Sequence, residues 1–125
     1  MHETSVVHNL IELIHEQLSR EGAVRVTAVH LAVGPLSGVA VEALRFAFDA
    51  AAPGTIVDGA RLEVITPPLT AWCRTCLATR ELRDVSRLLC PVCRQPTPEV
   101  SGGRELELER LEVIDLVLPE PAHAV

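Results

Sequence analysis

Two pairs of cysteines constrain this chain more than any other feature of its sequence. Two residues separate the cysteines within each pair, and thirteen residues separate one pair from the other. The four are Cys73, Cys76, Cys90 and Cys93. Each C-x-x-C pair can hold one side of a tetrahedral ion, and the intervening residues are enough for the chain to fold back on itself. The spacing therefore predicts one Zn²⁺ held by four thiolates in a zinc-ribbon-like lobe over residues 69–103.

Four protein ligands close the coordination shell of zinc, so the ion is expected to be structural and to order its lobe. All four cysteines of the chain belong to the two pairs, and the chain does not open with the basic and then apolar stretch of a secretory signal. Reduced thiolates in a cytoplasmic protein are therefore favoured, and two disulfides are the minor alternative.

Composition and charge exclude several classes of protein. With 125 residues, of which 48% are hydrophobic, the chain can bury one modest core beside a small metal-stapled lobe. No stretch of about 18 apolar residues occurs, so a membrane-spanning helix is not expected. The formal net charge of −6 argues against a nucleic-acid surface, which needs a concentrated basic face.

The basic residues are unevenly placed. All eleven are arginine, and five of them fall inside the cysteine segment, at Arg74, Arg80, Arg83, Arg87 and Arg94. Four thiolates around one Zn²⁺ carry an excess of two negative charges, which these arginines are expected to offset.

Two segments have the apolar periodicity of helices. Over residues 6–18 apolar side chains recur at helical spacing, and Thr4 or Ser5 is the expected cap of the first helix. Over residues 37–52 the pattern repeats, with Ser37 as the expected cap of the second helix.

Strand patterns alternate with these helices. Runs rich in β-branched residues predict strands over 24–33 and 60–65, and the extended apolar run over 104–118 predicts a third strand with a bulge or strong twist. The element order suggests that this last strand returns to the first sheet. We therefore expect an α+β fold of two helices on a three-stranded sheet, interrupted by the zinc lobe. The expected organisation is a domain over 1–68 completed by the strand 104–118, an inserted zinc-binding domain over 69–103, and a flexible tail over 119–125.

The histidine at the second position is a second candidate metal ligand. Beside an amino terminus, His2 can offer its imidazole Nδ1, its own backbone nitrogen and the terminal amine in adjoining chelate rings. Such nitrogen donors suit Ni(II) or Cu(II) in square-planar geometry. On residue chemistry alone, an ordinary exposed histidine near a chain end is the simpler interpretation of His2.

The other histidines give weaker signals. His8, Glu12 and His15 share one face of the first helix and are best explained as a solvated polar stripe. His30 lies in a predicted strand, where a hydrogen bond in the core or at an edge is expected, and His123 lies in the tail.

No catalytic constellation is present in the sequence. It contains no phosphate-binding G-x-x-x-x-G-K-[ST] loop, no H-E-x-x-H pair and no G-x-S-x-G elbow. The chain is therefore not expected to be an enzyme, and binding, delivery or scaffolding is favoured. Two alternatives stay open at this point. One is a zinc-ribbon module that binds nucleic acid or a protein, and the other is a small zinc-dependent enzyme with an open coordination position.

Several stretches together resemble the HypA/HybF nickel metallochaperones of hydrogenase maturation. They are Met1-His2-Glu3 at the start of a helix, Leu36-Ser37-Gly38 before Glu42-Ala43-Leu44-Arg45-Phe46-Ala47-Phe48, the paired cysteines, and Gly103-Arg104-Glu105-Leu106 before Leu111-Glu112-Val113. The resemblance runs in matching order from residue 1 to about residue 116. It makes His2 a much stronger candidate ligand than residue chemistry alone does.

The resemblance implies a protein with two metal sites. Its transferable Ni(II) would bind the imidazole of His2, with Glu3 contributing by its backbone, its carboxylate or orientation and the Met1 amine as a further donor. The four cysteines would hold structural Zn(II). A fourth nickel ligand is not identifiable, because Glu42 is equally explained by its favourable place in the first turn of a helix.

The family acts with a HypB-type GTPase and passes nickel to the large subunit of [NiFe]-hydrogenase, and some members also serve urease maturation proteins. Neither nucleic acid nor a membrane is among the implied partners. The sequence departs from the family where Leu77 replaces the usual glycine after the second cysteine and where Arg94-Gln95 follows the fourth. The turns of the two cysteine knuckles are therefore expected to differ.

Overall fold

The computed structural model describes residues 3–19 and 24–115 of the chain. In this part it contains two helices and six strands in two separate sheets, and clustering of contacts divides the chain into two compact units. Unit 1 comprises residues 1–31, 40–63 and 108–125, and unit 2 comprises residues 32–39 and 64–107. The prediction of a mixed α+β fold is confirmed, whereas the expected domain boundaries stay a prediction.

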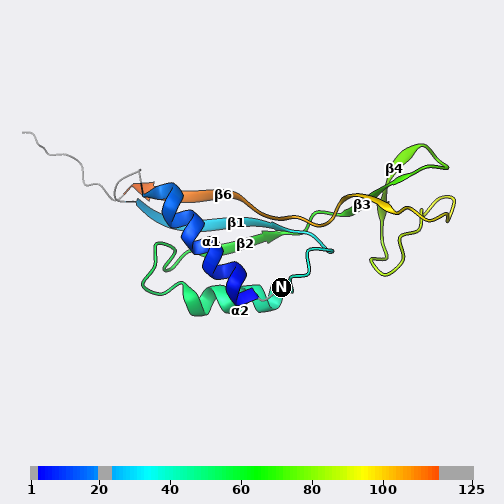
Figure 1. Ribbon diagram of the computed structural model, residues 1–125. Helices are drawn as coiled ribbons and strands as arrows, with labels where there is room; N and C mark the ends of the chain where they lie inside the picture. Colours follow the sequence, from blue (N-terminus) through cyan, green and yellow to red (C-terminus); the bar gives the residue numbers. More distant parts are fainter. Residues whose placement is uncertain (1–2, 20–23, 116–125) are drawn as a thin grey trace, which may run out of the picture. The chain divides into compact units, whose positions relative to one another are not determined.

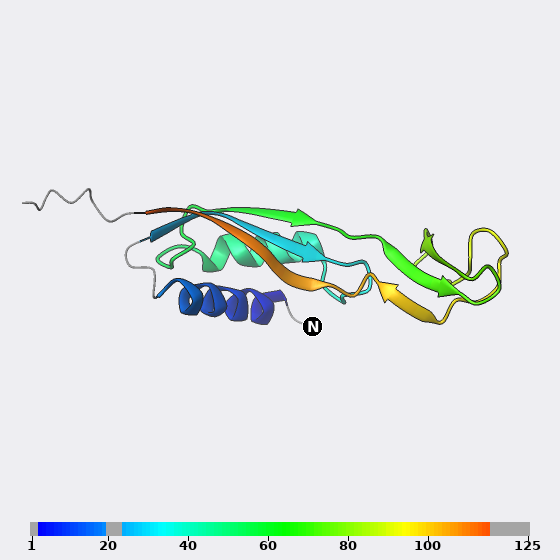
Figure 2. The same ribbon diagram turned by 90° about the horizontal axis from the view of Figure 1, so that it is seen from above.

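Unit 1 is built on the helices α1 (Glu3–Leu18) and α2 (Val41–Ala51), which lie against the first sheet (Figure 1). That sheet has the order β2-β1-β6, with β1 (Val24–Val33) in the middle, β2 (Arg61–Ile65) on one side and β6 (Leu106–Asp115) on the other. The long strands β1 and β6 run side by side (Figure 2). The last strand thus returns to the first sheet, as the sequence predicts.

The core of unit 1 lies where the apolar stripes of the helices meet the sheet. On α1 the side chains of Val7, Leu10 and Ile14 are buried, three and four residues apart, and on α2 those of Leu44 and Phe48 are buried four apart. This spacing places each set on one face of its helix. Among the described residues of β1 that belong to unit 1, the buried side chains are Val26, Ala28, Val29 and Leu31.

The predicted helix caps are wrong. Helix α1 already begins at Glu3, so Thr4 and Ser5 lie inside its first turn rather than before it. Helix α2 begins at Val41, and the Ser37 hydroxyl accepts the N–H of Val39 in a preceding turn instead of capping the helix. Tertiary contacts between the helices, which a local pattern does not report, decide where α2 starts.

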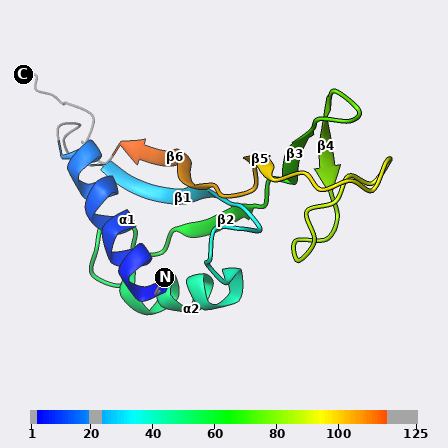
Figure 3. The same ribbon diagram turned by 45° about the vertical axis from the view of Figure 1, so that its right-hand side comes forward.

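Unit 2 contains the second sheet, of three short strands in the order β4-β3-β5 (Figure 3). The middle strand β3 (Leu69–Cys73) pairs antiparallel with β4 (Ala78–Leu82) and with β5 (Glu99–Gly102). Its small core consists of buried Leu69, Ala71 and Leu82, on which Leu36, Leu88 and Val100 pack.

The segment that follows β1 belongs to unit 2 because its backbone pairs with the residues that precede β6. The N–H of Gly34 donates to the carbonyl of Glu105 at 2.8 Å, and the N–H of Leu36 donates to the carbonyl of Gly103 at 2.6 Å. A Cβ atom at Gly34 would lie 2.2 Å from the Gly103 carbonyl oxygen, so glycine is needed for this approach of the two backbones. In the described part of the chain, neither helix has the length and apolar character needed to cross a membrane.

Candidate metal centre

The four cysteine sulfurs converge at one end of the second sheet. Cys73 is the last residue of β3, Cys76 lies in the turn to β4, and Cys90 and Cys93 lie in the loop between β4 and β5. All four Sγ atoms lie within 4.8 Å of one another, and the cysteines are free of disulfides. The alternative of two disulfides is therefore wrong for this structure, because a bonded pair of sulfurs is separated by only about 2.05 Å.

The sulfur spacing fits a tetrahedral zinc ion. With zinc–sulfur distances of about 2.3 Å, tetrahedral geometry separates two sulfurs by about 3.8 Å. The Sγ atoms of Cys73 and Cys93 are 3.5 Å apart, and those of Cys76 and Cys90 are 3.9 Å apart. Cys73 and Cys90 are buried and the other two are partly buried, so the chain itself supplies all four positions and screens them from water.

Each cysteine pair forms a tight knuckle whose backbone points N–H groups at sulfur. The N–H of Cys76 lies 3.4 Å from the Cys73 sulfur, and the N–H groups of Val92 and Cys93 lie 3.4 and 3.5 Å from the Cys90 sulfur. Such donors stabilise the thiolate form, which is the form that binds metal.

The residue after each pair adopts the left-handed conformation usual for glycine. Leu77 has a φ of 54° and Arg94 a φ of 63°. In the second knuckle the N–H of Arg94 donates to the Cys90 carbonyl at 2.8 Å, and the N–H of Cys90 donates to the Gln95 carbonyl at 2.9 Å. Both turns thus have a residue with positive φ although neither residue is glycine. The expectation that they differ from the turns of the family stays a prediction.

The two cysteines of the second knuckle ionise unequally. The N–H of Cys93, burial and the N–H of Val92 together set the pKa of the Cys90 thiol, and the two hydrogen bonds prevail to lower it to about 6. A hydrogen bond from Gln95 lowers the pKa of Cys93, but burial and the neighbouring Cys73 sulfur outweigh it and raise that pKa to about 11. Binding of Zn²⁺ releases whichever protons remain on the four thiols.

One of the five arginines predicted to offset the thiolate charge lies directly against the cluster. Arg80 of β4 is partly buried, and the nearby Cys76, together with Cys90, raises the pKa of its guanidinium. Arg74 instead forms an exposed ion pair with Glu99. The prediction of charge compensation is confirmed at Arg80, and Arg83, Arg87 and Arg94 line a surface hollow that includes Cys90.

The structure describes only one of the three residues of the predicted nickel site. Met1 and His2 lie outside the described residues, and Glu3 is the first residue of α1. The Oε2 atom of Glu3 accepts the N–H of Ala40 at 3.0 Å, 37 residues further along the chain. This contact of Glu3 is absent from the sequence interpretation, because only the packing of α1 against α2 brings the two residues together.

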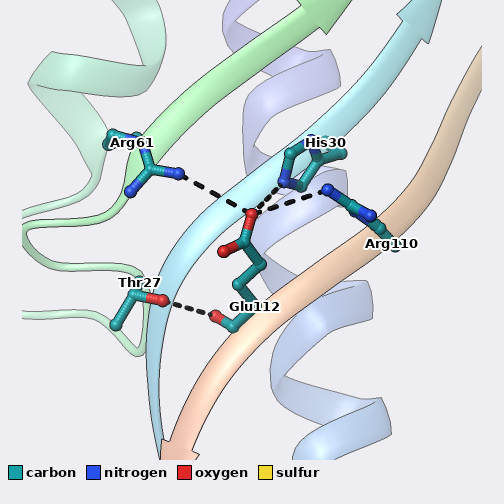
Figure 4. Close-up of polar contacts among 5 residues, drawn as sticks. All are labelled: Thr27, His30, Arg61, Arg110 and Glu112. Atoms are coloured by element: carbon teal, nitrogen blue, oxygen red, sulfur yellow. Dashed lines mark hydrogen bonds and ion pairs between the residues drawn. The ribbon is translucent and has the colours of Figure 1, made fainter.

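The remaining histidines behave largely as the sequence suggests. His8 and His15 are exposed on α1 together with Glu12. His30 makes the expected hydrogen bond, with its Nε2 atom 2.6 Å from Oε2 of Glu112 on β6. Arg61 and Arg110 lie 3.7 Å from the same oxygen, and the helices lie behind the strands that carry this cluster (Figure 4). His123 lies outside the described residues.

Among protein families, a family model matches residues 1–113 of the chain. The matching family is described as "Hydrogenase/urease nickel incorporation, metallochaperone, hypA". Curated relatives include the hydrogenase maturation factor HypA of Roseiflexus sp. (strain RS-1), which is 44% identical over 92% of this chain and 94% of its own length. The factor of the same name from Azotobacter chroococcum mcd 1 is 41% identical over 90% of this chain and 99% of its own.

Solved structures with a similar fold carry the same family name. The solution structure of the Ni metallochaperone HypA from Helicobacter pylori has a TM-score of 0.65 and 24% sequence identity, and the match covers 92% of this chain and 99% of that one. A second solution structure, of a HypA protein, has a TM-score of 0.66 at 24% identity. At this identity the likeness concerns the fold alone.

Proposed function

Because the chain belongs to the HypA family of hydrogenase and urease nickel-incorporation metallochaperones, we propose that it captures Ni(II) at its amino terminus and delivers it for the maturation of [NiFe]-hydrogenase. The family is one of metallochaperones, which carry a metal rather than turn over a substrate, so the prediction that the chain is not an enzyme is confirmed. Nickel is the cargo in this proposal, and zinc stays with the protein.

The observation that carries the proposal is the closed shape of the cysteine centre. Four sulfurs within 4.8 Å of one another fill every position of a tetrahedral ion. A metal held in this way by four thiolates is bound tightly and has no open position for ligand exchange. The transferable ion therefore needs a second, more open set of donors elsewhere in the chain.

We assign that open set to His2, with the Met1 amine as a further donor and with Glu3 contributing by its backbone, its carboxylate or the orientation of the site. Small chelate rings can form from the imidazole of His2, its backbone nitrogen and an adjoining amine. Such nitrogen donors suit Ni(II), whereas structural zinc is held by thiolates. A nickel ion at this site would have few protein ligands, and its other coordination positions could exchange. The ion could therefore be both captured and released. Because these nitrogens must lose protons to bind, nickel affinity should fall as the pH is lowered.

The proposal includes partners and a location. A HypB-type GTPase is the proposed source of the energy for transfer, since the sequence has no phosphate-binding loop. The large subunit of [NiFe]-hydrogenase is the proposed recipient, and urease maturation proteins are the alternative recipients. All of these assignments place the protein in the cytoplasm, where reduced cysteines persist.

The test is metal analysis combined with nickel titration of untagged, zinc-loaded protein. His2→Ala should lose nickel binding and keep one zinc, whereas His8→Ala, which changes an exposed histidine of α1, should leave both metals unchanged. A fused amino-terminal tag should weaken nickel binding if the Met1 amine is a donor. Unchanged nickel binding in His2→Ala would refute the proposed site.

A further inference from the structure

Helix α2 does not cap its own amino end. Its N-cap residue is Ala40, with φ −86° and ψ 120°, and an alanine methyl group cannot accept a hydrogen bond. The usual N-cap residues are serine, threonine, aspartate and asparagine, which supply an oxygen at this position. The start of α2 therefore depends on a group from elsewhere in the chain.

Glu3 supplies an oxygen to this helix end from α1. Its Oε2 atom accepts the N–H of Ala40 at 3.0 Å. In a capping box, the residue three positions after the N-cap is a glutamate or glutamine that reaches back to the N-cap N–H. That position of α2 is Ala43, so Glu3 takes the place of the missing side chain from a different helix. A carboxylate at this end also interacts favourably with the positive end of the helix dipole.

The same contact fixes the first turn of α1. Glu3 is the first residue of that helix, and α1 and α2 pack against each other. The Cα atoms of consecutive residues are about 3.8 Å apart. The proposed nickel donors of Met1 and His2 therefore belong to residues only one or two positions before Glu3. Glu3, bonded to Ala40, is therefore the described residue nearest in sequence to those donors.

We propose that the Glu3 carboxylate is a positioning group for the nickel donors and not itself a nickel ligand. By bonding the Ala40 N–H it holds the start of α1 against the start of α2, so that the imidazole and backbone nitrogens before it are already restricted when the metal arrives. This inference rests on the proposed function, since it concerns the same amino-terminal site. Of the three contributions that the family resemblance implies for Glu3, it selects orientation and excludes ligation by the carboxylate.

The bond can be removed from either partner. Glu3→Ala removes the acceptor, and Ala40→Pro removes the donor while residues 1–3 keep their own side chains. Ala40 is exposed and its φ of −86° is close to the range of proline, so the substitution is compatible with the local backbone. Glu3→Gln keeps an acceptor oxygen but replaces the carboxylate, and it therefore separates hydrogen bonding from metal ligation.

Val41→Pro is the matched control for the proline substitution. Val41 is the first residue of α2, where proline is favoured because its missing N–H is not needed within the helix. The ψ of 120° at Ala40 suits a residue that precedes proline, and the Ala40 N–H stays in place. This variant changes the same turn but keeps the bond to Glu3.

The experiment is nickel titration of the four zinc-loaded variants, with the absorption spectrum of the bound nickel recorded in each. Because ordering one residue of a loosened end corresponds to roughly a tenfold change in affinity, Glu3→Ala and Ala40→Pro should bind nickel about tenfold more weakly. Their nickel spectra at saturation should match the wild type, since no ligand is lost. Glu3→Gln should stay within about threefold of the wild type, and Val41→Pro should match it.

Three outcomes separate the possibilities. If Glu3→Gln binds as weakly as Glu3→Ala and its nickel spectrum changes, while Ala40→Pro binds normally, the carboxylate is a ligand and the inference is wrong. If Ala40→Pro does not fold, amide hydrogen exchange at Ala40 replaces it as a test: protection kept in Glu3→Gln but lost in Glu3→Ala supports the bond, and equal protection in both refutes it. Normal nickel binding in His2→Ala would instead overturn the proposed function, and that result does not depend on the Glu3 series.

Discussion

The Nε2 atom of His30 on β1 lies 2.6 Å from the Oε2 atom of Glu112 on β6, within the sheet of unit 1. The hydrogen bond from His30, together with the charges of Arg61 and Arg110, holds the pKa of the Glu112 carboxyl below its ordinary value of 4.5. The side chains of the cluster come from all three strands of the sheet, so one carboxylate joins the two outer strands to the middle one.

We predict that this carboxylate makes stability depend on pH in the acid range. A carboxyl whose pKa is lower in the folded state stabilises the fold above its unfolded pKa, and this stabilisation is lost as the pH falls through the folded pKa. The loss should therefore begin near pH 4.5 and continue below it. Glu112→Gln should flatten the pH dependence of urea unfolding in this range, whereas Glu109→Gln, an exposed residue of the same strand, should not. An identical pH profile for both variants would contradict the prediction.

Gly34 should tolerate no side chain. A Cβ atom there would lie 2.2 Å from a backbone oxygen and 2.4 Å from the carbonyl carbon of Gly103, and backbone atoms cannot rotate away as a side chain can. Gly34→Ala should cost about 3 kcal/mol, the upper end of the range for overpacking. Gly38→Ala is the comparison, because its added Cβ meets nothing within 4 Å and only its φ of 81° is strained. That variant should cost about 1 kcal/mol in the same denaturant unfolding experiment.

Arg80 should influence how tightly zinc is held. The nearby Cys76 and Cys90 raise the pKa of its guanidinium, so its charge is expected to compensate the thiolates. The removal of groups that support metal ligands typically lowers metal affinity about tenfold or more. Arg80→Ala should therefore lose zinc to a competing chelator at about one-tenth of the chelator concentration that the wild type requires. Arg74→Ala, which removes an exposed pair with Glu99, should release zinc as the wild type does. Equal release in both variants would show that the charge of Arg80 is not important.

Glycine should be the better residue after the first cysteine pair. Leu77 has a φ of 54°, a conformation that costs about 1–2 kcal/mol for a residue with a side chain, and its side chain is 73% exposed and so packs little. Glycine removes this strain but adds about 0.5–1 kcal/mol of backbone entropy to be lost on folding. Leu77→Gly should thus stabilise the protein by about 0.5 kcal/mol, measured by unfolding at a fixed free zinc concentration. In Val92→Gly, where no positive φ is present to relieve, stability should fall instead.

Local patterns predict well those features that depend on residues close together in the chain. The buried stripe of Val7, Leu10 and Ile14 can be predicted from the sequence because a helix brings residues three and four apart to one face. The cysteine centre can be predicted because the spacing within a C-x-x-C pair suits a metal-binding knuckle. The return of β6 to β1 follows from the element order, once the cysteine segment is recognised as an interruption.

Local sequence patterns do not predict contacts between residues that lie far apart in the chain. The bond between Glu3 and Ala40 joins two helices, and the contact of His30 with Glu112 depends on the register of strands 82 residues apart. The strands of the second sheet could not be predicted for a different reason. Strands β4 and β5 are only five and four residues long and contain little apolar periodicity. Arg80 is distinguished from four similar arginines only by its place on β4, opposite Ala71.

The order of strands in the two sheets also governs when each can assemble as the chain is synthesised. The strands β3, β4 and β5 and all four cysteines lie within residues 69–102, so this lobe closes only short loops and can load zinc as soon as that stretch has emerged. The first sheet must wait, because β1 acquires its partner β6 only when residues 106–115 are available. Pairing over such distances is slow to form. In a nascent chain, the second sheet and the cysteine cluster can therefore form before the first sheet is complete.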